Sequence, residues 1–131
     1  MTYLIDTHYL LWFFLDPGKI SSHLQDLFLN EHIPIYYSPI SLWEISLKYG
    51  KGKLVLEGIT PVELYEIIED SRLQCLATSN LVFVGNYQLP NSHLDPFDRL
   101  LCYQAIRHDF TLISVDSKLN AFKDFGLKLL S

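Results

Sequence analysis

The sequence predicts an α/β fold: a mainly parallel sheet of about five strands, flanked by helices on both faces. Two observations predict it. Short apolar runs typical of buried strands alternate along the chain with longer segments that carry helix-start signals. Strands separated by helices pair in parallel, and such a sheet is covered on both faces. The predicted strands are residues 3–5, 33–37, 73–77, 111–115 and 127–130.

Three helices are predicted from a proline at their first position. Residues 38–39, 60–61 and 95–96 each place a Ser, Thr or Asp cap before a proline, whose missing N–H costs nothing in the first turn. The strongest start is at Thr60, because Glu63 completes the pattern of a capping box. We expect these helices to extend to about residues 49, 71 and 107.

The other helices are predicted from apolar spacing. One follows Asp6 and runs to about residue 14, and another begins at residues 21–22, where Ser22 and Gln25 have capping-box spacing. A short helix is the preferred interpretation of residues 78–87. Residues 50–53 and 89–94 are predicted loops.

Length and composition indicate one domain over residues 1–131. With 49% hydrophobic and 19% charged residues, the chain is neither disordered nor fibrous. The net charge of −5 makes a polybasic, non-specific nucleic-acid binder a poor interpretation. A nuclease that clusters carboxylates remains compatible with this charge, because those carboxylates contribute to it.

The cysteines and the N-terminus indicate a cytoplasmic protein. Cys75 and Cys102 form no CxxC motif, and we interpret them as two reduced, mostly buried thiols. No apolar run approaches the roughly 20 residues of a membrane span, so no membrane association is expected. No Lys or Arg precedes Lys19, which argues against a signal peptide.

Four carboxylates stand at the ends of predicted elements. Asp6 and Asp116 end strands, whereas Glu44 and Asp98 lie in the first turns of helices. In a right-handed α/β fold these ends share one side of the sheet, where ligands bind. Converging carboxylates repel one another, and a hard divalent cation such as Mg²⁺ relieves that repulsion.

Each of these carboxylates also has a local structural interpretation. Asp6 and Asp116 can cap the helices that follow them, and Asp98 can interact favourably with its helix dipole. Glu44 can close a capping box with the serine three residues earlier, or pair with Lys48 one turn later. Spacing alone leaves these alternatives open.

Four segments carry a resemblance to a known family. Residues 4–12 (LIDTHYLLW), 38–45 (SPISLWEI) and 95–101 (DPFDRLL) resemble the signature segments of PIN-domain nucleases, most closely those of VapC-type toxins from toxin–antitoxin pairs. Residues 112–116 (LISVD) resemble the fourth segment. The match spans most of the chain, in order, from about residue 3 to residue 130.

The resemblance implies a PIN-like domain with Mg²⁺- or Mn²⁺-dependent endoribonuclease activity. By motif position, the acidic metal-binding and catalytic residues fall on Asp6, Glu44, Asp98 and Asp116, with Asp6 and Asp98 as the firmest metal contacts. Ser114 falls where the family often has a small hydroxyl residue that supports the fourth acid. The implied partners are an RNA substrate, a cognate antitoxin protein and a second copy of the chain in a homodimer.

Asp95 is a rival to Asp98 within the third segment. We assign it instead as the N-cap before Pro96.

Basic and aromatic residues near these segments have two interpretations each. Lys48, Lys51, Lys53 and Arg99 can position phosphate or form an ordinary solvated face, and Arg99 can instead pair with Asp98.

The aromatic run at residues 12–14 has a similar ambiguity. It indicates either a second apolar surface for a dimer or an antitoxin, or a helix buried on several sides.

Two other functional classes compete with a nuclease. The first is a non-catalytic PIN-fold module that binds RNA or protein, against which the presence of all four acids argues. The second is another acid-cluster enzyme. A receiver domain needs a Lys at the end of a late strand, and no predicted strand of this chain ends in such a Lys. A haloacid-dehalogenase phosphatase needs a D-x-D pair after the first strand, where this chain has Asp6-Thr7-His8 instead.

Overall fold

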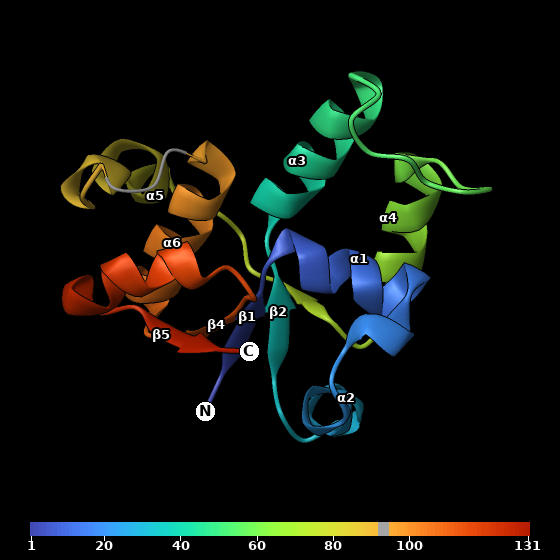
Figure 1. The fold of residues 1–131 in the computed structure, drawn as a ribbon, viewed down its shortest axis with the longest axis horizontal. Helices are drawn as coiled ribbons and strands as arrows, with labels where there is room; N and C mark the ends of the chain where they lie inside the picture. The colour runs from blue at the N-terminus through green and yellow to red at the C-terminus, as the bar shows by residue number, and fades with distance from the viewer. Residues whose placement is uncertain (92–94) are drawn as a thin grey trace.

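The centre of the fold is a five-stranded, all-parallel sheet. The computed structural model describes residues 1–91 and 95–131. The strand order is β3-β2-β1-β4-β5, with β1 in the middle (Figure 1). The predicted fold class and pairing direction are confirmed. The strands are β1 (Tyr3–Ile5), β2 (Ile35–Tyr37), β3 (Gln74–Cys75), β4 (Thr111–Ile113) and β5 (Lys128–Leu130).

Helices cover both faces of this sheet, as predicted. α1, α2 and α4 pack over one face, whereas α5, α6 and the 3₁₀ helix η3 pack over the other (Figure 1). α3 contributes to both cores, with Ile40 in the core beneath α6 and Ile45 in the core beneath α1. The α-helices are α1 (Thr7–Leu15), α2 (Ser22–Leu29), α3 (Pro39–Gly50), α4 (Pro61–Glu69), α5 (Asn80–Gly85) and α6 (Pro96–His108). The 3₁₀ helices are η1 (Pro17–Lys19), η2 (Asn86–Gln88) and η3 (Ser117–Phe125).

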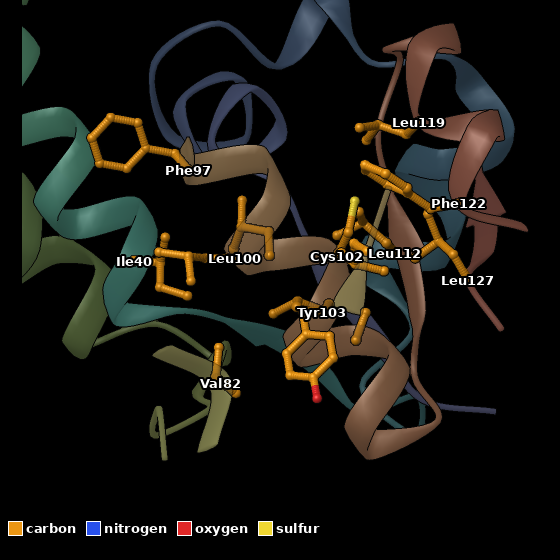
Figure 2. Packing of buried hydrophobic residues seen from close by; sticks show 14 of the residues in the cluster. Ile40, Val82, Phe97, Leu100, Cys102, Tyr103, Leu112, Leu119, Phe122 and Leu127 are labelled. Carbon is orange, nitrogen blue, oxygen red and sulfur yellow. The ribbon is translucent and has the colours of Figure 1, made fainter. Parts of the chain in front are cut away.

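Successive residues of the central strands enter two separate cores. Leu4 and Leu112 lie in the core beneath α5 and α6, where Figure 2 shows Leu112 beside Cys102. Ile5 and Ile113, one position later, lie in the core beneath α1 to α4. This alternation follows from the two-residue period of a strand. As a result, both faces of the sheet are buried, and the position of a residue in its strand decides which face its side chain enters.

The helix starts marked by proline are confirmed. Thr60 Oγ1 accepts a hydrogen bond from the Glu63 N–H (3.2 Å), and Glu63 Oε1 accepts one from the Thr60 N–H (3.0 Å). This is the reciprocal capping box that the sequence predicts for α4. Ser38 caps α3 by accepting from the Ile40 N–H (3.1 Å).

Four strands are shorter than predicted, and two of them differ only at the start: β2 begins at Ile35 instead of residue 33, and β5 at Lys128 instead of residue 127. β3 has two residues where 73–77 was expected, because it is an edge strand that pairs only with the short β2. β4 ends at Ile113, not at residue 115, because the chain then turns into η3. The predicted short helix at residues 78–87 appears as α5 followed by η2.

The predicted capping box at the start of α2 is wrong. Ser21 occupies the N-cap position, so that Ser22 lies one residue inside the helix. The Gln25 amide instead donates to the carbonyls of Ile20 (2.7 Å) and Pro17 (3.1 Å). Gln25 therefore ties α2 to η1, a contact that gives no local sequence signal.

The prediction for the cysteines is correct for one thiol and wrong for the other. Both are free; Cys102 is buried, but Cys75 is exposed because β3 is the edge of the sheet. The end of the predicted 89–94 loop, residues 92–94, lies outside the described residues. In the described part of the chain, no helix has the length and apolar character needed to cross a bilayer.

The aromatic run of α1 is half-buried. Trp12, Phe13 and Phe14 all pack against the core beneath α1. The Phe13 ring centroid lies 4.8 Å from that of Phe14 and 5.6 Å from that of Phe28. These contacts favour the interpretation of α1 as a helix packed on several sides.

Candidate active site

The strand order reverses between β1 and β4. From β1 the chain moves outward through β2 to β3, and it then returns to place β4 on the other side of β1. Ligands of open α/β sheets bind at the carboxyl ends of strands where the order reverses in this way. Asp6 follows β1 directly, and its N–H donates to the carbonyl of Ile113 at the end of β4 (3.0 Å). The first predicted acid therefore stands at the reversal.

Asp6 is a buried carboxylate. Only 3% of the residue is exposed, and its Oδ1 accepts from the Tyr9 N–H (2.9 Å) as the N-cap of α1. Burial raises the pKa of Asp6 to about 6, against its ordinary 3.8. Hydrogen bonds from Tyr9 and Ser114 oppose this rise, whereas the nearby charge of Asp98 adds to it. Asp6 thus caps α1, and burial disfavours its ionised form.

Ser114 connects the first acid to the fourth. Its side chain hydrogen-bonds the Asp6 carboxylate, and its Oγ accepts from the Asp116 N–H (3.2 Å). Asp116 is half-buried, and its Oδ1 accepts from the Lys118 N–H (3.0 Å) at the start of η3. Ser114 therefore contacts the side chain of Asp6 and the backbone of Asp116. The second contact is what the resemblance leads us to expect, since it supports the fourth acid.

Asp98 lies in the first turn of α6, above the buried thiol of Cys102. Burial raises the pKa of Cys102, and the charges of Asp98, Asp6 and Asp116 raise it further. Three of the four predicted acids, which belong to three different segments of the chain, therefore raise the pKa of the same thiol. Asp95 is the N-cap of α6, because its Oδ1 accepts from the N–H groups of residues 97 (2.9 Å) and 98 (3.1 Å). The assignment of Asp95 as a cap is confirmed.

Glu44 joins the site through Thr7. Glu44 is 4% exposed, and its Oε1 accepts a 2.6 Å hydrogen bond from Thr7 Oγ1. Thr7 Oγ1 also lies 2.9 Å from Ser41 Oγ. Because Ser38, not Ser41, caps α3, the capping-box alternative for Glu44 is wrong. The side chain of Glu44 is instead held against the residue that follows Asp6.

The other carboxylate oxygen of Glu44 pairs with Lys48. Lys48 Nζ binds Glu44 Oε2 one turn along α3, as the pairing alternative predicts. Partial burial lowers the pKa of Lys48, but the hydrogen bond and charge of Glu44 and the charges of Asp95 and Asp98 outweigh it, so this pKa is raised. Lys48 thus stands between Glu44 and the first turn of α6.

The four acids surround one region without forming a ready cluster. Across residues 1–91 and 95–131, no three His, Cys, Asp or Glu side chains are arranged so that they could hold a metal ion together. Asp6, Asp98 and Asp116 share an electrostatic environment, whereas Glu44 is occupied by Thr7 and Lys48.

Arg99 has a structural role that the sequence did not reveal. Its guanidinium donates to the backbone carbonyls of Pro90 (2.6 Å), Asn86 (2.8 Å) and Leu89 (3.3 Å). Both terminal nitrogens are engaged in this way, which favours neither of the predicted roles of phosphate contact and ion pair. Arg99 fixes the irregular segment that precedes α6.

Sequence reasoning missed Thr7 as a site residue. A hydroxyl directly after a strand-end Asp is a weak signal, since Thr and Ser are common near helix starts. The hydrogen bond to Glu44 spans 37 positions of sequence, so that only the fold reveals it.

The comparisons with known proteins identify the family and the fold. The family model of the PIN domain matches residues 3–125. The search of curated proteins finds no match. The fold is similar to that of solved structures whose sequences are 16% to 21% identical to this chain.

Three of those structures contain toxin–antitoxin proteins. One is VapBC2 from Rickettsia felis bound to a DNA fragment from its promoter, at 21% identity and TM-score 0.72, covering 99% of this chain and 98% of that chain. Another is VapBC-1 from nontypeable Haemophilus influenzae, at 17% identity and TM-score 0.69, covering 100% and 98%. A third is FitAcB from Neisseria gonorrhoeae, at 19% identity and TM-score 0.65, covering 99% and 97%. The family match and the all-parallel sheet with its reversal at Asp6 lead to one conclusion: the chain belongs to the PIN domain family.

Proposed function

We propose that this protein is a metal-dependent endoribonuclease that acts as the toxin of a toxin–antitoxin pair. The observation that carries the proposal is the Asp6 carboxylate, which is buried at the sheet reversal, has a raised pKa and faces the charge of Asp98. In an enzyme that binds a cation at this point, such a buried carboxylate attracts the cation. In a protein that binds no cation there, the buried charge only lowers the stability of the fold.

The donor set fits a hard divalent cation. Asp6 and Asp98 would hold it first, with Asp116 and Glu44 completing an all-carboxylate set, the ligand type that Mg²⁺ and Mn²⁺ prefer. When bound, such an ion supplies Lewis-acid chemistry to an RNA phosphodiester. Glu44 becomes available only when Lys48 releases its second oxygen.

The chain's own residues prepare this site. Ser114 orients Asp6 and the Asp116 backbone, and Thr7 orients Glu44. Hydrogen bonds of this kind fix ligand geometry before a cation arrives. In the same proposal Glu44 or Asp116 takes the proton of the attacking water.

The proposed partners follow from the relatives. VapBC and FitAB proteins were crystallised as complexes, three of them on DNA. We extend this to a cognate antitoxin and a homodimer, in the cytoplasm.

One observation favours a second candidate, a PIN-fold module that binds RNA or protein without cutting it. The Lys48–Glu44 ion pair occupies a carboxylate that a nuclease would need. A cleavage experiment separates the two functions.

The test is cleavage of a mixed cellular RNA pool by antitoxin-free protein in Mg²⁺, in Mn²⁺ and in EDTA. We expect discrete fragments with either metal and none in EDTA. Asp98→Asn should give none under any condition while keeping the wild-type circular dichroism spectrum. Metal-independent fragments, or equal cleavage by Asp98→Asn, would contradict the nuclease. Folded wild-type protein that cuts nothing would favour the binding module.

A further inference from the structure

A small cavity adjoins the acidic region on the side of α3. Its volume is about 190 Å³. Its polar lining consists of Thr7, His8, Glu44, Lys48 and Lys53, and the remaining lining side chains are aliphatic. Pockets that enclose drug-sized ligands measure roughly 300–1,000 Å³, so this one suits a phosphate group better than a whole nucleotide.

The backbone brings Lys53 to this cavity. At the end of α3 the chain reverses through Gly52, whose φ of +72° is in the left-handed region that favours glycine. The Lys53 N–H then donates to the Lys48 carbonyl (2.8 Å), as does the Leu54 N–H (3.2 Å). Lys53 therefore lies next to Lys48 because of a fixed turn. Lys51, in the same loop, is exposed and does not line the cavity.

The charge of the cavity wall is uneven. Lys48 pairs with Glu44, so these two side chains largely neutralise each other. Lys53 forms no ion pair with any residue of the described chain. The ammonium group of Lys53 is thus left to attract an anion in a cavity that Glu44 also lines.

We propose that this cavity binds a backbone phosphate of single-stranded RNA next to the phosphate that is cut, with Lys53 as the principal contact. The inference rests on the proposed function, since it takes RNA as the substrate. It gives the acidic region a neighbouring subsite of opposite charge, which holds the strand while the carboxylates attract a cation. Phosphate contacts of this kind set register and affinity without reading sequence.

The test compares two lysines of one loop. Binding of a fluorescent single-stranded oligoribonucleotide is measured in EDTA, between about 50 and 200 mM KCl. Lys53→Ala should weaken binding about three- to tenfold, and should reduce the slope of log K against log salt by about 0.7, the value for one lost contact on a single strand. Lys51→Ala is the matched control and should bind like wild type. Lys53→Arg should retain most of the affinity.

The outcomes separate the subsite from the nuclease. Equal binding by Lys53→Ala and Lys51→Ala would overturn the subsite, as would wild-type protein that binds no RNA. Cleavage in Mg²⁺ is scored independently. Lys53-dependent binding without cleavage would contradict the proposed nuclease and leave the phosphate subsite standing. Cleavage with no effect of Lys53 on binding would contradict the subsite alone.

Discussion

Thr7 Oγ1 donates a 2.6 Å hydrogen bond to Glu44 Oε1, so the residue that follows the first acid holds the second. The two residues belong to α1 and α3, which pack against each other. Asp6 and Glu44 are thereby linked through one side chain. The hydroxyl of Thr7 fixes one carboxylate oxygen of Glu44 and leaves the other to Lys48.

Thr7→Val removes this hydrogen bond with little change in shape. We expect the free energy of unfolding to fall by about 1–3 kcal/mol, because a buried carboxylate loses a donor. Cleavage should fall about ten- to a hundredfold, as when other residues that orient metal ligands are changed. Urea unfolding and the RNA cleavage assay measure the two effects. Thr7→Ser, which keeps the hydroxyl, should restore both, and wild-type cleavage by Thr7→Val would refute this positioning role.

Asp95 and Asp98 form a matched pair with opposite expectations. Asp95→Ala removes the cap of α6 and should lower the free energy of unfolding by about 1 kcal/mol while cleavage persists. Asp98→Asn should abolish cleavage and change stability by less than about 1 kcal/mol, since asparagine keeps the size of the side chain and removes one negative charge from the first turn of the helix. Thermal unfolding and RNA cleavage on both variants decide this. Loss of cleavage in Asp95→Ala alone would reverse the two assignments.

Arg99→Lys should destabilise the protein without altering the acidic region. A lysine cannot reproduce the fork that reaches the carbonyls of Asn86, Leu89 and Pro90. The expected loss is about 1–3 kcal/mol in urea unfolding. Arg107→Lys, on the exposed last turn of the same helix, is the control and should stay within about 0.5 kcal/mol of wild type. Equal stability of the two variants would show that the fork is dispensable.

The parts of the fold predicted from sequence are those with local signals. Alternating apolar runs and helix starts predicted the five parallel strands, and the proline-marked caps at residues 38–39, 60–61 and 95–96 all appear. The Ser22–Gln25 spacing failed because Gln25 binds carbonyls of the preceding turn instead. The exposure of Cys75 depends on which strand forms the sheet edge, and periodicity does not state strand order.

The candidate site was predicted in outline and missed in its connections. Motif positions indicated four acids, and in the fold burial and the charges of three of them, Asp98, Asp6 and Asp116, raise the pKa of Cys102. The contacts that organise them join distant segments, such as Thr7 with Glu44. Such contacts arise only after the helices pack, so no short pattern encodes them.

Asp6→Asn should stabilise the metal-free protein at neutral pH. Burial raises the pKa of Asp6 to about 6 in the folded state, above its ordinary 3.8 in an unfolded chain. The folded state therefore binds the carboxyl proton of Asp6 more tightly than the unfolded chain does. The contribution of this proton to the free energy of unfolding is fully present below about pH 4 and is lost as pH rises through about 6. Asparagine avoids the buried charge and can still accept from the Tyr9 N–H.

The difference in unfolding free energy between Asp6→Asn and wild type should thus be small near pH 4 and grow to roughly 1–3 kcal/mol by pH 7. Urea titrations in EDTA across this range measure it. Mg²⁺ should then stabilise the wild type more than the variant, because a bound cation offsets the charge only where that charge exists. An Asp6→Asn protein that is less stable than wild type at pH 7 in EDTA would show that the buried carboxylate does not lower the free energy of unfolding.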